Sequence, residues 1–395
     1  MAISEYDLGI VGGGLAGLSL AIQMARQGFR VILWEQKSYP FHRVCGEYIA
    51  DESRAFLGQL GLDLEALALP QIRRLLVSDP AGKTLESPLL PGGFGISRHL
   101  LDHLLAQRAQ AEGVTLLEKT RVRGLQFIAA SGNKDGNPGG SEHFEVDTTA
   151  GPFTVRQLCG AFGKYDRLDL NLRPERLPAQ TGVKTYVGIK YHLRLRWSQD
   201  LIALHNFAGG YCGISAIEAD RVCACYLVSA EAFQAAGGQP KALEAQIQNP
   251  YLQSIFKHAE HLYQKPQAIA QVQFAPRSLI EDHVLMLGDA AGLIPPLCGN
   301  GMSMAFRASA LLAEHLQPFL ANQISRTELE AAYQRDWKQA FGHRLQTGRR
   351  LQGIFGRVWP AKLLVGSLKH LPTFSQQIIT NTHGNRFSAL NANPD

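Results

Sequence analysis

Cysteine is scarce in this chain, and the six cysteines form no pattern typical of a metal site or a disulfide scaffold. No C-x-x-C pair is present, and six cysteines are too few to stabilise a 395-residue chain by disulfides. Four isolated histidines show no ligand spacing and are interpreted as structural or surface residues, namely His192, His205, His283 and His315. We therefore expect reduced thiols, a cytoplasmic location and no metal site.

The sequence also lacks a run of about 18 uncharged apolar residues, the minimum for a membrane-spanning helix. No charged leader precedes an apolar signal core, because a strand pattern begins by Tyr6. Neither sign of charge dominates, since 39 Lys and Arg against 34 Asp and Glu leave a formal net charge of +5. That bias is too mild for a general nucleic-acid-binding protein. These absences predict a protein that spans no membrane and has no nucleic-acid partner.

Hydrophobic residues make up 45% of the chain and charged residues 18%, which is enough for a large buried core. Near the N-terminus, an apolar run at residues 7–11 stops at three glycines, and apolar residues then recur at helical spacing over residues 15–26. Residues 30–34 are again a buried-strand pattern. This order is a βαβ unit, and it predicts a parallel sheet and a doubly wound α/β fold.

The three glycines begin a G-x-G-x-x-G motif, formed by Gly12, Gly14 and Gly17, between the predicted strand and the predicted helix. Gly12 permits the tight turn, Gly14 lets a pyrophosphate approach the helix N-terminus, and Gly17 lets helix and strand pack closely. Glu35 ends the next strand and is suited to accept both ribose hydroxyls. With Ala16 in the same turn, these residues predict a dinucleotide site, although the motif alone does not distinguish NAD from FAD.

A second glycine-rich segment, Gly-Asp-Ala-Ala-Gly at residues 288–292, follows a predicted strand, and residues 295–302 lead into a predicted helix. The two segments resemble the second flavin signature of the para-hydroxybenzoate hydroxylase-fold flavoproteins. That group includes group A flavin monooxygenases, geranylgeranyl reductases and flavin-dependent halogenases. The resemblance covers the chain in the right order and implies FAD as the cofactor. It also implies that Arg98 contacts the ribityl chain and that the Val122 backbone holds the adenine.

Physical reasoning supports a flavin-binding role for this second segment. Asp289, which follows Gly288 at a strand end, can accept a hydrogen bond from a ribityl hydroxyl. The amides of Gly301 and Met302 at a helix start are suited to face the flavin pyrimidine edge, where they would stabilise the negative charge of the reduced state. We therefore expect these four residues to contact the cofactor.

Residues 43–48, Arg-Val-Cys-Gly-Glu-Tyr, lie at the distance from Glu35 where these flavoproteins bring a loop beside the isoalloxazine. The Cys-Gly pair resembles the geranylgeranyl reductase branch, which implies a catalytic place for Cys45 near the flavin and the substrate. A buried structural cysteine is an equally good interpretation. Arg43 is expected to contact the cofactor phosphate or ribose, and Glu47 and Tyr48 are weaker candidates.

Two departures from the family pattern bear on the chemistry. The Gly-Ala-Asp-Gly motif of many group A monooxygenases is here Gly-Ala-Phe-Gly, at residues 160–163. The missing aspartate helps to position FAD and the nicotinamide in those enzymes, so direct use of NAD(P)H, the candidate electron donor, is in doubt. The Trp-x-Trp-x-Ile-Pro motif of the tryptophan-type halogenases is absent, which disfavours that branch.

The expected architecture is α/β with an α+β second domain. It combines a Rossmann-type FAD-binding domain, a strand-rich substrate domain and a helical C-terminal region. The expected boundaries are 1–74, 97–175 and 276–330 for the FAD-binding domain, 75–96 for an excursion into the substrate domain, 176–275 for the β-rich substrate domain and 331–395 for the helical region.

The C-terminal end carries a separate signal, because residues 335–370 hold eight Lys or Arg against Asp336 alone. Interleaved apolar residues would give this stretch a basic amphipathic surface for an anionic lipid, an acidic carrier protein or a phosphorylated substrate. A solvated helix face over an ordinary core is the plainer interpretation. We expect a cytoplasmic protein that is at most peripheral to a membrane.

These observations predict an FAD-dependent oxidoreductase that acts on a small apolar organic substrate. Two reactions fit: hydroxylation through a flavin C4a-hydroperoxide, or ene-reduction of an isoprenoid-like lipid by hydride from flavin N5. Cys45 and the missing aspartate favour the reductase. The alternative is a non-catalytic flavin-binding protein with a redox-sensing or scaffold role.

Overall fold

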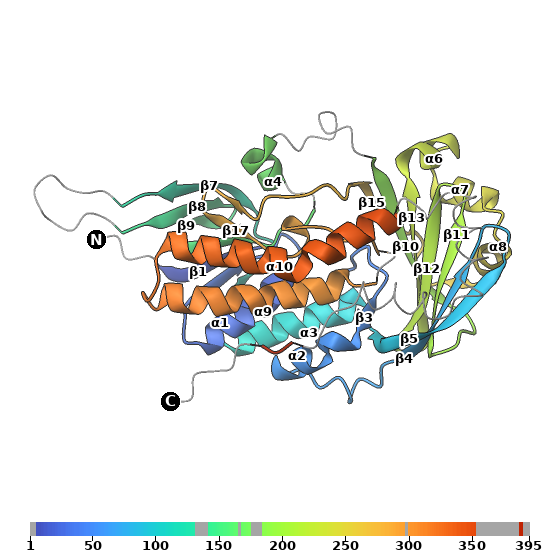
Figure 1. Cartoon of the computed structure of the whole chain (residues 1–395), viewed down its shortest axis with the longest axis horizontal. Helices are drawn as coiled ribbons and strands as arrows, with labels where there is room; N and C mark the ends of the chain where they lie inside the picture. The colour runs from blue at the N-terminus through green and yellow to red at the C-terminus, as the bar shows by residue number, and fades with distance from the viewer. Residues whose placement is uncertain are drawn as a thin grey trace, which may run out of the picture.

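The computed structural model describes residues 5–130, 141–164, 167–174, 184–296, 299–352 and 387–389. Within these residues the strands form two sheets, one of eight strands and one of nine. Figure 1 shows the sheets at opposite ends of the molecule, with the long helices gathered around the first sheet. The α/β class and the strand-rich second region predicted from the sequence are confirmed.

The first sheet has a parallel core built from short apolar strands. Strand β1 pairs in parallel with β2 on one side and with β9 on the other, and its residues Leu8 and Ile10 are fully buried. A strand covered on both faces needs the near-continuous apolar sequence found there. The strands of this sheet are β1 (Tyr6–Val11), β2 (Val31–Trp34), β6 (Thr115–Leu117), β7 (Val122–Ile128), β8 (His143–Thr148), β9 (Gly151–Gly160), β16 (Ile280–Glu281) and β17 (Val284–Met286).

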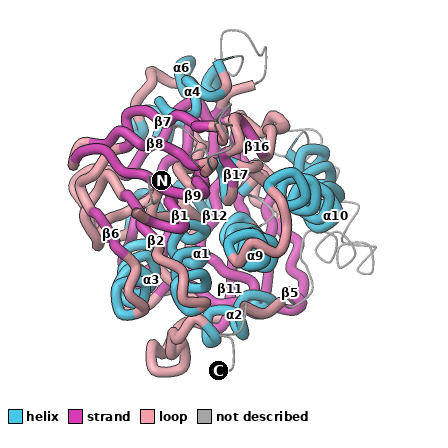
Figure 2. The backbone as a smooth tube through the Cα atoms, turned by 90° about the vertical axis from the view of Figure 1, so that its left-hand side faces the viewer, coloured by secondary structure: helices cyan, strands magenta, loops and turns pink. Residues whose placement is uncertain are grey.

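Three helices gather on one side of the parallel strands of the first sheet, and β7 and β8 lie on the other side of those strands (Figure 2). The three helices are α1 (Leu15–Arg26), α3 (Arg98–Ala111) and α9 (Gly301–Leu320). Helix α3 begins after Ser97, whose hydroxyl accepts a hydrogen bond from the Leu100 amide and caps the helix. Helix α10 (Arg326–Gln352) packs along α9, as Figure 1 shows. Phe306 of α9 and Phe341 of α10 are fully buried in the shared core.

The second sheet receives strands from two separate parts of the chain. Its order is β14-β10-β13-β12-β11-β4-β5-β3, with β15 also paired to β10. Its strands are β3 (Tyr48–Ala50), β4 (Gln71–Ser78), β5 (Thr84–Gly95), β10 (Tyr186–Arg194), β11 (Leu201–Phe207), β12 (Gly210–Ile217), β13 (Arg221–Ser229), β14 (Glu260–His261) and β15 (Gln267–Val272). Because β3 ends at Ala50 and β4 begins at Gln71, the chain joins this sheet earlier than the expected excursion at 75–96. The domain boundaries stay a prediction.

Alternate residues of β10 face opposite sides of the second sheet. Ile189 and Tyr191 are buried against short helices on the side away from the first sheet (Figure 1). These helices are α6 (Ala230–Ala235), α7 (Pro240–Gln246) and α8 (Pro250–His258). The intervening residues Lys190 and His192 therefore face the end of the molecule that holds the first sheet.

The remaining α-helices of the described residues are short, and they are α2 (Arg54–Gln59) and α4 (Arg167–Leu172). Among the helices of the described ranges, none combines the length and the apolar character needed to cross a membrane.

Candidate active site

The glycine-rich turn after β1 has the geometry of a phosphate-binding loop. Gly12 has a φ of +107°, and a Cβ on Gly17 would lie 2.2 Å from the Gly12 carbonyl oxygen, so both positions require glycine. A Cβ on Gly14, by contrast, would meet none of the described atoms within 4 Å. Gly14 is the N-cap of α1, so this open space adjoins the backbone N–H groups of a helix N-terminus. An anionic group such as a pyrophosphate fits there.

Glu35 directly follows β2 and lies buried beside the glycine-rich turn. One of its carboxylate oxygens accepts hydrogen bonds from the Gly13 amide and from the Arg43 guanidinium, both at 3.0 Å. The other oxygen accepts a hydrogen bond from one backbone amide and can accept another from a ribose hydroxyl. The Thr120 amide donates to the Glu35 carbonyl, which brings the start of β7 at Val122 to the same end of the site.

The two glycine-rich segments, far apart in the sequence, meet in the structure. A Cβ on Gly288 would lie 3.1 Å from the Cβ of Ala16. Asp289 follows in a single turn of 3-10 helix (Gly288–Ala290), and its side chain is 36% exposed. Lys164 Nζ lies 3.8 Å from Asp289 Oδ2. The Asp289 carboxylate is thus available near the N-terminus of α1, where the sequence predicted one end of a dinucleotide.

Two buried arginines that no sequence motif marks hold the turn that carries Asp289. Arg277 Nη1 donates to the Asp289 carbonyl at 2.7 Å, and Arg173 Nη2 donates to the Ala290 carbonyl at 3.2 Å. Asp169 forms an ion pair with Arg173. These bonds fix the backbone of the turn, and the fixed backbone sets the direction of the Asp289 side chain. Sequence reasoning missed both arginines because their partners are carbonyl groups elsewhere in the chain.

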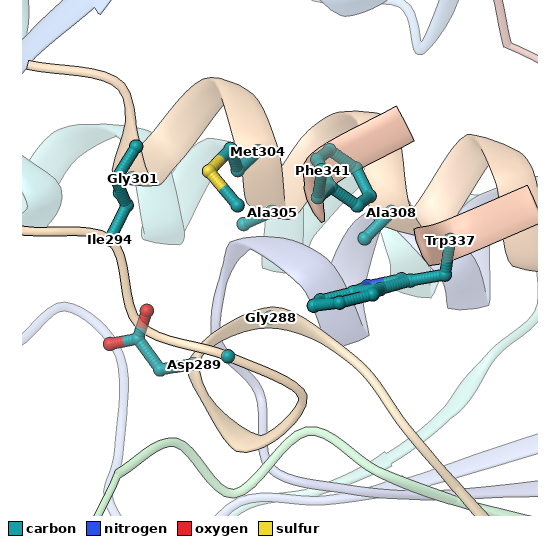
Figure 3. A pocket seen from close by; sticks show the side chains of 10 residues that line it. Gly288, Asp289, Ile294, Gly301, Met304, Ala305, Ala308, Trp337 and Phe341 are labelled. Carbon is teal, nitrogen blue, oxygen red and sulfur yellow. The ribbon is translucent and has the colours of Figure 1, made fainter. Parts of the chain in front are cut away.

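A small pocket lies behind the same turn, between α9 and α10 (Figure 3). In this view Asp289 and Trp337 lie on opposite sides of Gly288. A Cβ on Gly292 would approach the Trp337 ring to 3.1 Å, so the turn packs closely against α10. Gly301, the first residue of α9, also lines the pocket. Gly288 and Asp289 line it as well, so the pocket lies directly against the turn that carries the Asp289 carboxylate.

Asp102 joins two arginines of the predicted cofactor site. Its carboxylate accepts two hydrogen bonds from Arg98, at 2.7 and 2.8 Å, and one from Arg43 at 3.0 Å. Burial opposes the charge on Arg98, but Asp102 outweighs it and raises the pKa of Arg98. Cys45 and Asp289 also interact electrostatically with Arg98, so both lie near it.

FAD fits this set of residues. The open helix N-terminus at Gly14 suits the pyrophosphate, Glu35 suits the ribose, and Asp289 with Arg98 suits the ribityl chain. These groups lie at the carboxyl ends of parallel strands or in the segments that follow, which is where open α/β sheets bind nucleotides. The individual contacts, including those of Val122, Gly301 and Met302, stay predictions.

The loop at residues 43–47 connects the cofactor end to the second sheet. Cys45 is half-buried, and its carbonyl accepts a hydrogen bond from Cys223 Sγ at 3.4 Å. The Gly46 carbonyl accepts one from Ser215 Oγ, also at 3.4 Å. Burial raises the pKa of Cys225 to about 12, so this neighbouring cysteine is a neutral thiol at pH 7. The loop thus rests on a polar face of β12 and β13.

Glu47 is the centre of a buried charged cluster at this junction. Its carboxylate forms an ion pair with Lys190, and its other oxygen lies 2.5 Å from His192 Nε2. All three side chains are 0% exposed. Burial alone would raise the pKa of Glu47, but Lys190 and His192 outweigh it and lower that pKa. Glu47 is therefore an ionised carboxylate inside the protein.

Three aromatic side chains extend this cluster toward its accessible rim. Tyr263 Oη lies 2.6 Å from His192 Nδ1 and 3.4 Å from His42 Nδ1. The His42 ring stacks on His99, with ring centroids 4.5 Å apart. Tyr263, His42 and His99 are partly exposed, whereas His192 is fully buried. A continuous polar path therefore runs from the rim to Glu47.

His192 is neither isolated nor on the surface, so that part of the sequence interpretation is wrong, whereas its interpretation as a structural residue stays a prediction. It is buried, and it bonds to a carboxylate from the flavin-binding end of the chain. The signal that was available is the alternation on β10, where Lys190 and His192 stand two residues apart between apolar neighbours. Two ionisable residues on one face of a buried strand indicate a paired or functional cluster.

Comparison with known proteins agrees with this geometry. Residues 5–129 match the protein family described as FAD binding domain. The chain is 25% identical over 370 residues to conditioned medium factor receptor 1 of Dictyostelium discoideum, covering 86% of this chain and 69% of the relative. It is 25% identical over 349 residues to kynurenine 3-monooxygenase of Stenotrophomonas maltophilia, covering 80% and 73%. The chain is an FAD-dependent oxidoreductase.

The fold of this oxidoreductase is also shared with a solved structure. A geranylgeranyl bacteriochlorophyll reductase-like protein from Thermoplasma acidophilum superposes with a TM-score of 0.75 at 16% identity, over 97% of this chain and 96% of that one. This likeness confirms the para-hydroxybenzoate hydroxylase fold expected from the two flavin motifs. The comparisons favour a catalytic protein over a non-catalytic flavin-binding scaffold.

One departure from the family pattern has a visible structural consequence in this FAD-dependent oxidoreductase. Phe162 replaces the aspartate of the family motif, and its ring lies against Gly160, where a Cβ would meet it at 2.7 Å. The Phe162 backbone also lies against Gly12, at the start of the glycine-rich turn. An aromatic packing residue therefore occupies the position of a charged group.

The predicted basic stretch is described as far as residue 352. Arg344 is buried and lies 3.4 Å from Glu52 Oε1, and burial lowers its pKa. Contrary to expectation, Arg344 is therefore not part of a basic surface, because the side of α10 that carries it packs against the core. Lys338 and Arg350 are exposed, and residues 353–370 of the stretch lie outside the described residues.

Proposed function

We propose that this FAD-dependent oxidoreductase is a monooxygenase that hydroxylates a small aromatic substrate carrying a weakly acidic hydroxyl group. The observation that carries the proposal is the composition of the second sheet where it meets the loop at residues 43–47. That face is polar at one end and apolar at the other. A small aromatic ring with one hydroxyl group matches such a face.

The polar end is built from two rows of residues that run across three strands. His192, Cys223 and Ser215 are cross-strand neighbours in one row. Lys190 and Cys225 are neighbours in the next row. The loop at residues 43–47 covers these rows, so a substrate would meet this end through the partly exposed His42, His99 and Tyr263 at its rim. A long isoprenoid chain would leave the polar atoms of that rim without water, which argues against a purely apolar lipid at this end.

The apolar end begins one row further along the same face. Tyr211 pairs with Leu227, and both are buried in one cluster with Leu204 and Phe274. Leu293, which follows the turn that carries Asp289, belongs to the same cluster. An aromatic ring is suited to contact such a surface while a hydroxyl points toward the polar rows. This arrangement supports a substrate with an apolar frame and one polar group.

The cofactor part of the site is proposed on the residues already described. Gly14, Glu35, Arg98 and Asp289 would hold FAD, and Arg277 would keep the turn of Asp289 in place. When bound, FAD supplies the redox chemistry, by accepting electrons from a donor and activating dioxygen. NAD(P)H is the proposed donor. The side chains of this chain bind, orient and exchange protons with the substrate.

Ene-reduction of an isoprenoid-like lipid is the second candidate, and Cys45 is the observation that favours it. Cys45 is half-buried and lies near Arg98, at the junction where the sequence predicted a catalytic cysteine. Phe162 in place of the family aspartate points in the same direction. The two reactions differ in their products, so one experiment separates them.

The test uses the holoenzyme with NADH or NADPH, a panel of phenols and isotopically labelled dioxygen, with isoprenoid lipids in parallel. Mass spectrometry of the products should show one labelled oxygen atom in a hydroxylated phenol. A lipid product that gains two hydrogens and no label would replace this proposal with ene-reduction. Reduced flavin that reoxidises without any product in either panel would refute both reactions.

Contact of the basic stretch at residues 335–370 with an anionic lipid or an acidic carrier protein is a separate proposal. Within its described part it is supported by the exposed Lys338 and Arg350. Arg335 adds little, because it pairs with Asp336 next to it. Such contact would deliver a poorly soluble substrate without its free diffusion through water.

A further inference from the structure

We propose that Cys45 and Cys225 form a peroxide-responsive pair, in which a disulfide ties the loop at residues 43–47 to strand β13 of the second sheet. The inference goes beyond the proposed hydroxylation, and it applies equally to ene-reduction. It assigns a modification site for hydrogen peroxide, the by-product that forms when a reduced flavin reacts with dioxygen without transferring oxygen to a substrate.

Three hydrogen bonds hold this loop across three neighbouring strands, β10, β13 and β12. Lys190 Nζ on β10 donates to the Arg43 carbonyl at 3.1 Å. Cys223 Sγ on β13 donates to the Cys45 carbonyl at 3.4 Å, and Ser215 Oγ on β12 donates to the carbonyl of the following residue, also at 3.4 Å. The loop therefore crosses the strands in the order of its own residues, and Cys45 lies over β13.

Cys225 is the thiol of β13 that the loop leaves partly open. Cys223 and Cys225 stand two residues apart, so both face the loop. Cys223 is fully buried, whereas Cys225 and its cross-strand neighbour Gly213 are partly exposed. The other face of the sheet is covered by α6, α7 and α8, so this exposure opens at the edge of the loop, next to the apolar end of the face.

Cys45 brings the second sulfur to this edge of the loop. Its side chain is half-buried, and the Glu47 amide donates to its Sγ at 3.5 Å. Cys45 and Cys225 interact electrostatically, so the two thiols lie near one another. A Cβ on Gly46 would meet none of the described atoms within 4 Å, which leaves the loop room to reach the Cα separation of about 4.4–6.8 Å that a disulfide needs.

The surroundings of the two thiols give them different roles. The thiolate is the form of cysteine that attacks a peroxide. The Arg98 guanidinium lies near Cys45, where it stabilises the negative charge of an attacking sulfur. Burial raises the pKa of Cys225 to about 12, so Cys225 takes part as a neutral thiol. Cys45 is therefore the sulfur that attacks the peroxide, and Cys225 is the sulfur that completes the disulfide.

The oxidation balances with one molecule of hydrogen peroxide. Cys45 Sγ forms a bond to one peroxide oxygen and the O–O bond breaks, so the other oxygen leaves as water with the thiol proton and Cys45 becomes a sulfenic acid. Cys225 Sγ then forms a bond to that sulfur and the S–O bond breaks, so the hydroxyl leaves as water with the Cys225 proton. Two electrons and two protons pass from the thiols to the peroxide. A thiol reductant reverses the change.

The disulfide would close the edge of the loop above Gly213 and Cys225, where the polar rows meet the apolar end of the face. A substrate frame that contacts the apolar end would then be excluded, so enzyme that releases peroxide without product would stop. A purely structural role for both cysteines is the competing interpretation. It predicts thiols that stay reduced, as expected for Cys159, which is fully buried in β9.

The test maps disulfides in the FAD-loaded enzyme by mass spectrometry of its peptides. Excess hydrogen peroxide should link the peptides of Cys45 and Cys225 and lower the count of free thiols by two per chain, and dithiothreitol should reverse both changes. Enzyme whose flavin is reduced by light and reoxidised in air should give the same link. Cys225→Ser should instead leave a sulfenic acid on Cys45 that dimedone traps. Cys159→Ser is the matched control and should leave the link unchanged.

Each outcome decides the proposal. Peptides that stay unlinked in wild type would overturn the pair, and a link from Cys45 to Cys223 would overturn the assigned partner. A link that forms without peroxide or air, with bleaching of the flavin, would overturn peroxide as the oxidant. Linked enzyme that turns over its substrate as fast as reduced enzyme would overturn the closing of the site. The peptide readout needs no substrate, so failure of the proposed hydroxylation leaves this test intact.

Discussion

The ion pair between Glu47 and Lys190 gives the sharpest energetic prediction, and Lys190→Met is the perturbation that tests it. Methionine keeps the apolar length of the lysine side chain but removes the ammonium that faces Glu47. Both side chains are 0% exposed, so water cannot replace the lost partner. Removing one member of a buried pair leaves an uncompensated charge and typically costs about 3–5 kcal/mol. We expect a loss of that size in the free energy of unfolding at pH 7.

The magnitude is limited by what remains around Glu47. His192 Nε2 still donates to the other carboxylate oxygen, at 2.5 Å, and the Arg98 amide donates at 2.8 Å to the oxygen that faced Lys190, so Glu47 keeps two hydrogen bonds. Its pKa should rise when the ammonium is gone, because burial then dominates. The loss should therefore lie at the lower end of the range, and it should shrink as the pH falls and Glu47 takes up a proton.

Urea unfolding of the FAD-loaded enzyme at pH 7 and at pH 5 measures this loss directly. The double variant Glu47→Gln with Lys190→Met removes both charges and should be more stable than Lys190→Met alone. A matched control is Lys338→Met on the exposed side of α10, which should change stability by less than about 0.5 kcal/mol. A loss below about 1 kcal/mol for Lys190→Met, with no recovery in the double variant, would refute a buried, charged Glu47.

Gly14→Val fills the open space at the start of α1 and should abolish FAD retention, measured as flavin absorbance per protein after gel filtration; wild-type retention would refute the phosphate site. Asp289→Ala removes a charge-assisted hydrogen bond worth about 1.5–3 kcal/mol, so FAD affinity should fall about 10- to 100-fold in a fluorescence titration while the protein remains folded. Burial lowers the pKa of His205 to about 4, so the unfolded chain binds a proton that the folded state excludes between pH 6.5 and 4. Stability should fall across that window, and His205→Gln should remove about 3 kcal/mol of the fall in urea titrations. Lys338→Gln with Arg350→Gln should weaken binding to anionic vesicles at low salt by about 2 kcal/mol, and unchanged binding would exclude these side chains from a membrane contact.

The cofactor half of the fold follows from short-range patterns. The turn of Gly12, the helix of residues 15–26 and the strand before Glu35 are neighbours in the sequence, and each has a local physical cause. Their positions relative to one another are set within one βαβ unit. The structure also brings Ala16 against Gly288, in line with a cofactor shared between the two glycine-rich segments.

The substrate half does not follow from local patterns, because its partners come from distant segments. Glu47 comes directly before a three-residue strand, whereas Lys190 and His192 lie on β10. Alternation places Lys190 and His192 on one face of β10. The packing of α6 to α8 on the opposite face decides which end of the molecule that face is turned toward. The sequence alone therefore identifies Lys190 and His192 as a pair but does not identify Glu47 as their partner.

Arg344 shows the same limit at a helix. Its charge placed it in the predicted basic surface, since a lone arginine on a helix is normally solvated. In the structure α10 packs along α9, and Glu52, from a turn far earlier in the chain, supplies a buried partner for the guanidinium. A charged side chain is expected to be exposed to solvent only where the protein interior offers no partner of opposite charge.

The backbone at Glu47 carries the argument for its role one step further. Glu47 has a φ of +59°, a left-handed conformation that glycine or asparagine adopts at less cost than glutamate. Such a residue typically costs about 1–3 kcal/mol and persists where the surroundings over-determine it. Here the Ile96 amide donates to the Glu47 carbonyl and the Arg98 amide donates to its carboxylate, while Lys190 and His192 bind the rest of that carboxylate. Glutamate at this position is explained by its carboxylate and not by its backbone. Glu47→Gly should therefore relieve the backbone strain and still destabilise the folded enzyme. A Gly variant more stable than wild type would show that the contacts of the carboxylate do not stabilise the fold.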